Sequence, residues 1–166
     1  MGPAKLLVLS SLGLALSRKN PCRALRNGVC MPQVALGTGY HGALPVPEAI
    51  EHAHNATMKW LSQGGEHVDT AHWYTDEPGV GSGWKASGLD RKDIFLTTKM
   101  PSALGREAVL EYFANSTRDL QTDYIDLYLL HTPSMPQGNG QQTPTQCGVN
   151  VSWASCRVET LSLIHI

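Results

Sequence analysis

The chain has 166 residues, 42% of them hydrophobic, and its 13 Lys and Arg residues are nearly balanced by 14 Asp and Glu residues. This length and composition are typical of a single soluble globular domain. The balanced charge argues against nucleic acid or an anionic membrane surface as a partner, so a small molecule is the expected ligand.

Residues 1–21 differ in composition from the rest of the chain. Lys5 precedes an apolar stretch from Leu6 to Leu16, and the segment closes on the small residues Ala15 and Ser17. This layout is typical of a secretory signal peptide and is too short to span a bilayer. The alternatives are a disordered extension and a wrongly chosen start codon. Under each of these interpretations, no membrane segment is expected in the mature protein.

Glycosylation triplets and cysteines are relevant to whether the protein is secreted, but they do not decide it. Asn-x-Ser/Thr triplets begin at Asn55, Asn115 and Asn150 and would matter only in a secreted protein. The cysteines lack C-x-x-C spacing, which argues against a zinc knuckle or a thioredoxin-like site. They are Cys22, Cys30, Cys147 and Cys156. Disulfide pairing in an oxidising compartment stays open, and so does the location of the protein.

Short apolar runs recur between residues 31 and 133 at intervals of about thirty residues, which is the length of a βαβ unit. They end near Gly37, Asp69, Lys99 and His131. The runs show little alternation of polar and apolar residues, as expected of parallel strands that are covered on both faces. The pattern therefore predicts a parallel α/β fold.

The segments between these runs predict helices. The first, residues 46–65, has Pro47 where a first turn tolerates proline, apolar residues at helical spacing, and a stop at Gly64 and Gly65. Residues 105–121 repeat the apolar spacing. Residues 77–88 predict a poorer helix because they contain several glycines.

In a parallel sheet the ends of successive strands gather at one edge, and in barrels this edge is the active face. Asp69, Lys99 and His131 are therefore expected to be neighbours, and Tyr74, in the loop after Asp69, can fold back over them. The Lys99 ammonium would favour the Tyr74 phenolate, and Asp69 would balance that ammonium. His131 could donate a hydrogen bond to a carbonyl oxygen. A hydride must come from a nicotinamide cofactor, because no side chain supplies one.

Residues 27–133 resemble the first half of an aldo-keto reductase. The blocks NGVCMPQVALGTG, GGEHVDTAHWYTDEPGVG, RKDIFLTTKMP and DYIDLYLLHTP occur in the family's order and at its spacing. The resemblance implies a (β/α)8 barrel, of which residues 22–133 would form about the first four βα units. It also implies reduction of aldehydes or ketones to alcohols, with NADP(H) as cofactor, a small carbonyl compound as substrate, and a cytoplasmic location.

The resemblance further implies roles for particular residues. The family's catalytic tetrad falls on Asp69, Tyr74, Lys99 and His131, with Tyr74 as the proton donor. The turn at Gly37, Thr38 and Gly39 matches the turn beside the nicotinamide end of the cofactor. Trp73 matches a residue at the mouth of the substrate pocket. Apart from the resemblance, Glu77 and Asp126 are expected to be structural, as buried partners or caps, and no chemistry is assigned to them.

A metal-dependent barrel hydrolase is a minor alternative. His67 and Asp69 lie on one face of a predicted strand and could present two ligands to a zinc-like ion, with His131 as a third. This interpretation leaves Tyr74 and Lys99 unexplained.

Beyond residue 133 the resemblance ends. Residues 134–166 are rich in Gly, Pro, Gln, Thr and Ser and predict an irregular tail. Its last six residues, LSLIHI, resemble a translated sequencing adapter, and the alternative is a fifth strand over VETLSLIHI. A complete barrel needs about 250 residues. A truncated reductase and a non-catalytic half-barrel without cofactor binding are thus both open, and open sheet edges would favour self-association.

Overall fold

The computed structural model describes residues 20–39, 44–102 and 105–132. The signal or extension predicted at the N-terminus and the irregular tail lie almost wholly outside these residues, as do Cys147 and Cys156. Those interpretations therefore stay predictions.

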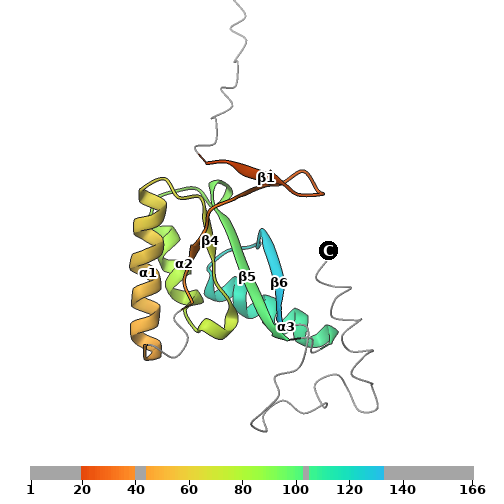
Figure 1. Cartoon of the computed structure of the whole chain (residues 1–166). Helices are drawn as coiled ribbons and strands as arrows, with labels where there is room; N and C mark the ends of the chain where they lie inside the picture. The colour runs from red at the N-terminus through yellow and green to blue at the C-terminus, as the bar shows by residue number, and fades with distance from the viewer. Residues whose placement is uncertain (1–19, 40–43, 103–104, 133–166) are drawn as a thin grey trace, which may run out of the picture.

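A parallel sheet of four strands in chain order forms the centre of the molecule, with each strand paired to the next. The strands are β3 (Leu36–Gly37), β4 (His67–Asp69), β5 (Phe95–Ser102) and β6 (Leu127–Thr132). In Figure 1, β4, β5 and β6 lie side by side in the order in which they occur along the chain. The repeat of strand and helix predicted from the sequence is confirmed.

Helices connect the strands and cover one face of this sheet (Figure 1). They are α1 (Val46–Ser62), α2 (Glu77–Ala86) and α3 (Arg106–Asp119). The main core lies between the sheet and α1 and α2, where Leu61, Val68, Val80 and Leu96 are buried. A smaller cluster around Met100 lies under α3. The opposite face of the sheet is left for the polar residues of the candidate site.

The N-terminal part of the described chain differs from the prediction. The apolar run MPQVALGTG is split between β3 and a second strand, β2 (Cys30–Pro32), which pairs antiparallel with β1 (Cys22–Ala24). A Cys22–Cys30 disulfide joins the two strands of this hairpin. The Asn27–Gly28 turn, with Gly28 at φ 82°, is the sequence signal that would have indicated it.

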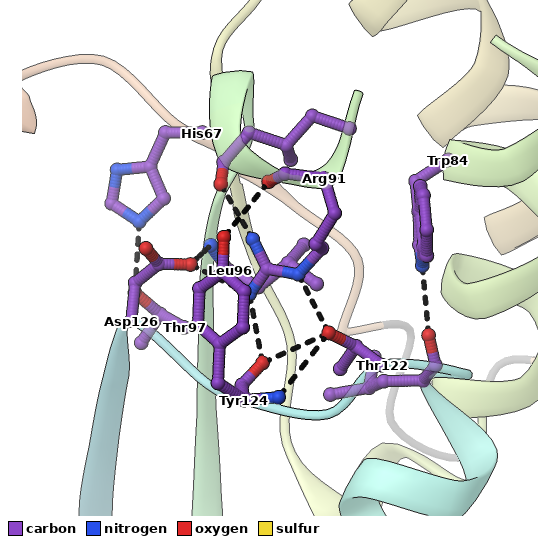
Figure 2. A network of polar contacts seen from close by, with 10 residues as sticks. His67, Trp84, Arg91, Leu96, Thr97, Thr122, Tyr124 and Asp126 are labelled. Carbon is purple, nitrogen blue, oxygen red and sulfur yellow. Dashed lines mark hydrogen bonds and ion pairs between the residues drawn. The ribbon is translucent and has the colours of Figure 1, made fainter. Parts of the chain in front are cut away.

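Two short 3-10 turns, η1 (His72–Tyr74) and η2 (Arg91–Asp93), follow β4 and precede β5. Arg91 of η2 fastens the loop before β6 to the sheet: its guanidinium donates to Asp126, to the Thr122 hydroxyl and to the Tyr124 carbonyl over 2.7, 2.7 and 2.9 Å (Figure 2). Asp126 in turn accepts from the Leu96 amide. The structural role expected for Asp126 agrees with these contacts.

Within the residues that the structure describes, no helix combines the length and apolar character that crossing a membrane would require.

Candidate active site

The predicted site residues come from four elements that meet at the carboxyl ends of the strands. Asp69 is the last residue of β4, Lys99 lies in the second half of β5, and His131 is the penultimate residue of β6. Tyr74 closes the η1 turn, directly after β4. Asp69, Lys99 and His131 alternate with residues that face the helices, so they project from the sheet face that the helices leave uncovered.

An ion pair lies at the centre of this group. The Lys99 ammonium donates to Asp69 Oδ1 over 2.5 Å and to the Thr70 carbonyl over 2.8 Å. The Lys99 side chain is 14% exposed and that of Asp69 is 35% exposed. A partly buried ammonium needs such partners, because its desolvation would otherwise be costly. Lys99 is thereby held as a fixed positive charge at the rim of the sheet.

The tyrosine lies against this charge. Lys99 Nζ is 5.2 Å from the centroid of the Tyr74 ring. The His131 ring meets the Tyr74 ring edge to face, at 5.6 Å between centroids, and lies 5.2 Å from the Trp73 ring. The structure thus brings together the four residues of the predicted tetrad, with the partly exposed Trp73 beside them.

The turn after β3 reaches the same place. Gly37 is paired with Asp69 across the sheet, and the Thr38 amide donates to the Asp69 carbonyl. A Cβ on Gly39 would lie 2.8 Å from two atoms of the Tyr74 ring, so only glycine lets the turn lie this close to the phenol. A Cβ on Gly37, in contrast, would meet nothing within 4 Å. Gly39 therefore lets the turn pack against the tyrosine ring, whereas the backbone at Gly37 has open space beside it.

The metal alternative is not favoured by the geometry of His67. Its Nδ1 lies 3.0 Å from the Pro32 carbonyl oxygen and its Nε2 2.8 Å from the Thr97 hydroxyl, so both ring nitrogens already have protein partners. The described segments contain no group of three or more His, Cys, Asp and Glu side chains suited to a metal. His67 instead fastens the N-terminal hairpin to β5.

Two buried carboxylates next to the site were not assigned chemistry from the sequence. Asp76 and Glu77, at the start of α2, are 1% and 2% exposed. Burial raises the pKa of Asp76, a hydrogen bond from the Thr70 hydroxyl lowers it, and the charge of Glu77 raises it. The burial of Glu77 agrees with the structural role, as a buried partner or cap, that was expected for it. No such expectation was made for Asp76, because an aspartate at a helix start is ordinarily a solvent-exposed cap.

Comparison with known proteins shows which family the fold belongs to. The profile of the aldo/keto reductase family matches residues 33–141. Morphine 6-dehydrogenase of Pseudomonas putida is 41% identical over 70% of this chain and 37% of the relative. The 9,11-endoperoxide prostaglandin H2 reductase of Trypanosoma cruzi is 40% identical over 68% of this chain and 38% of the relative. The Bombyx mori aldo-keto reductase solved in complex with NADP superimposes with a TM-score of 0.65 at 30% identity, over 86% of this chain and 46% of that one.

These matches define the class: the parallel βα units are those of an aldo-keto reductase barrel. The chain belongs to the aldo/keto reductase family. It spans less than half the length of the relatives it matches.

Proposed function

We propose that this protein is an NADP(H)-dependent oxidoreductase that reduces small aldehydes or ketones to alcohols. The observation that best supports the proposal is the convergence of Tyr74 with Lys99, Asp69 and His131 at one edge of the sheet. The family acts on small carbonyl compounds. Trp73, 37% exposed beside His131, would line the entrance for such a substrate.

The chemistry of these side chains suits proton transfer to a carbonyl oxygen. As the carbonyl carbon is reduced, its oxygen gains negative charge, and the Tyr74 phenol would donate the proton that makes the alcohol. The neighbouring Lys99 ammonium would stabilise the phenolate that Tyr74 becomes. Asp69 holds that ammonium in place, and His131 would donate a hydrogen bond to the same oxygen.

The family uses NADP(H), which supplies the hydride when bound. The residues present fit one end of this cofactor: the backbone at Gly37 has open space where a side chain would stand, and Gly39 lies against the Tyr74 ring. Gly37, Thr38 and Gly39 would hold that end. The family's remaining cofactor contacts come from later strands that the matched segment does not include.

Replacement of the phenol tests the proposal. We expect Tyr74→Phe to lower kcat for carbonyl reduction by about a hundred-fold or more, because a general acid contributes that much. NADPH affinity should change little, since the hydroxyl acts only in the chemical step. Tyr124→Phe, at an exposed tyrosine beside Arg91, is the control. Full activity of Tyr74→Phe would contradict the assignment.

A second candidate, a non-catalytic half-barrel, is favoured by the half-exposed strand β6, which has only β5 as a neighbour among the described strands. Quenching of the chain's tryptophans by NADPH distinguishes the two. Micromolar binding by the purified 166 residues would support a working cofactor site. The absence of quenching up to millimolar NADPH would support the half-barrel.

A further inference from the structure

The two buried carboxylates at the start of α2 bind the strands that hold the ion pair. Asp76 Oδ1 accepts a 2.7 Å hydrogen bond from the Thr70 hydroxyl, and Glu77 Oε1 accepts one of 2.7 Å from Thr98. Thr70 follows Asp69 in the chain, and Thr98 precedes Lys99. Each carboxylate therefore lies behind one partner of the ion pair, on the helix-facing side of the sheet.

Glu77 has a second close polar contact that Asp76 lacks, although it is not a hydrogen bond. Its Oε2 lies 3.5 Å from Nδ1 of His72, the first residue of η1. The other side of the His72 ring is covered edge to face by the Tyr112 ring of α3, at 4.7 Å between centroids. Glu77 and Tyr112 thus hold His72 between α2 and α3.

Short-range hydrogen bonds close the η1 turn, one of them from the Thr75 hydroxyl to the Tyr74 carbonyl over 2.7 Å. The Tyr74 amide donates to the Ala71 carbonyl over 2.9 Å, and the Thr75 amide donates to the His72 carbonyl over 3.2 Å. Thr75 then adopts φ 57°, a left-handed conformation that costs a non-glycine residue about 1 kcal/mol or more. These bonds shape the turn, and the His72 side chain fastens it toward the helices through Glu77 and Tyr112.

Trp73 and Tyr74, the other two residues of η1, lie on the opposite side, against His131. We propose that Glu77, acting through His72, is a positioning residue that sets where the Tyr74 ring lies relative to Lys99 and His131. The effect on catalysis rests on the proposed function, whereas the effect on the placement of Tyr74 does not.

Fluorine NMR of the full chain with fluorotyrosine tests the placement directly. The Tyr74 resonance is assigned by its loss in Tyr74→Phe, and Tyr124, distant beside Arg91, serves as the reference resonance. We expect Glu77→Gln and His72→Gln each to shift the Tyr74 resonance by more than its line width. The double variant should shift it no further than the larger single shift, because both act through one contact.

Asp76→Asn is the matched control, since Asp76 is an equally buried carboxylate at the same helix start that contacts Thr70 instead of η1. It should leave the Tyr74 resonance in place. An unmoved resonance in folded Glu77→Gln, an equal shift in Asp76→Asn, or additive single shifts would each overturn the proposal. If Glu77→Gln does not fold, His72→Gln decides alone, because His72 is partly exposed.

Activity separates this inference from the proposed function. If both hold, Glu77→Gln should lower kcat about ten- to a hundred-fold with little change in KM, because a misplaced catalytic group slows the chemical step more than binding. If the proposed function fails, Tyr74→Phe will have no activity to remove, and the fluorine shifts still decide whether Glu77 positions Tyr74.

Discussion

At the scale of single residues, burial decides which charges have consequences. The Lys99–Asp69 and Lys92–Asp90 pairs have the same chemistry, but the side chains of the second pair are 74% and 71% exposed. An exposed pair of this kind contributes little to stability, because water and salt screen it. Lys99, in contrast, is enclosed, so its charge acts on the nearby Tyr74 ring. The two pairs cannot be distinguished from residue type alone.

Asp76 gives a pH-dependent prediction. Its pKa is 3.8 in an unfolded chain and is raised by burial in the folded protein. At low pH both states are protonated; as the pH rises through the folded pKa, the buried carboxyl ionises and its contribution to stability is lost. We therefore expect the free energy of unfolding of the wild type, relative to Asp76→Asn, to be highest below about pH 4 and to fall toward neutral pH.

Urea denaturation of both proteins between acid and neutral pH measures this difference. The control is Asp90→Asn, because a hydrogen bond from Lys92 lowers the pKa of Asp90 and the dependence should have the opposite sign. The explanation by burial would be wrong if the difference between the wild type and Asp76→Asn did not change with pH.

At the scale of elements, α2 shows why a poor helix former is still helical. Its glycines lower the intrinsic helix propensity, yet the structure has a regular helix of ten residues there. A Cβ at Gly79 would lie 2.1 Å from the Ile50 carbonyl oxygen, and one at Gly83 would lie 2.6 Å from the His54 carbonyl oxygen. The glycines let α2 approach the α1 backbone closely, and this packing outweighs the loss of propensity.

Replacement of these glycines should therefore destabilise the fold. We expect Gly79→Ala and Gly83→Ala each to lower the free energy of unfolding by about 1 to 3 kcal/mol, because α1 and α2 must move apart. Thermal or urea denaturation gives the value. Lys85→Ala, at an exposed position of the same helix, is the control and should change stability little. A gain in stability from Gly79→Ala would mean that propensity, not packing, dominates in α2.

The Arg91 network gives a prediction for the connection between α3 and β6. Arg91 uses several nitrogens at fixed angles toward Asp126, Thr122 and backbone carbonyls (Figure 2). A lysine cannot reproduce this planar pattern. Arg91→Lys should therefore cost about 1 to 3 kcal/mol of unfolding free energy. Arg118→Lys, at a more exposed position, is the control and should change the unfolding free energy little. Equal losses at both positions would mean that the planar hydrogen-bond pattern of Arg91 does not determine its contribution.

At the scale of the molecule, the two longest strands, β5 and β6, differ in how deeply their residues are buried. All residues of β5 except Lys99 are buried, whereas all six residues of β6 are only partly buried. An uncovered strand edge with apolar side chains favours pairing with another chain. The predicted self-association would use this edge.

We expect the purified 166-residue chain to elute as an oligomer in size-exclusion chromatography with light scattering. Leu129→Lys, in the middle of β6, should shift it toward the monomer, because a charge on a strand edge opposes pairing. Leu110→Lys, at an exposed position of α3, is the control. If Leu129→Lys and Leu110→Lys reduced association equally, the interface would not be specific to β6.

The sequence determined the parallel repeat and the strands that bear Asp69, Lys99 and His131, because a period of about thirty residues and apolar strands are local properties. The predicted strand end at Lys99 was three residues short, since β5 continues to Ser102. Through the family resemblance it also predicted Tyr74 as the proton donor, and that assignment stays a prediction. Only the tertiary structure decided that Asp76 is buried, that Thr70 and Thr98 donate hydrogen bonds to Asp76 and Glu77, and that the α2 glycines lie against α1. These properties depend on contacts between residues far apart in the chain, and no local pattern specifies which distant group will exclude water from a side chain.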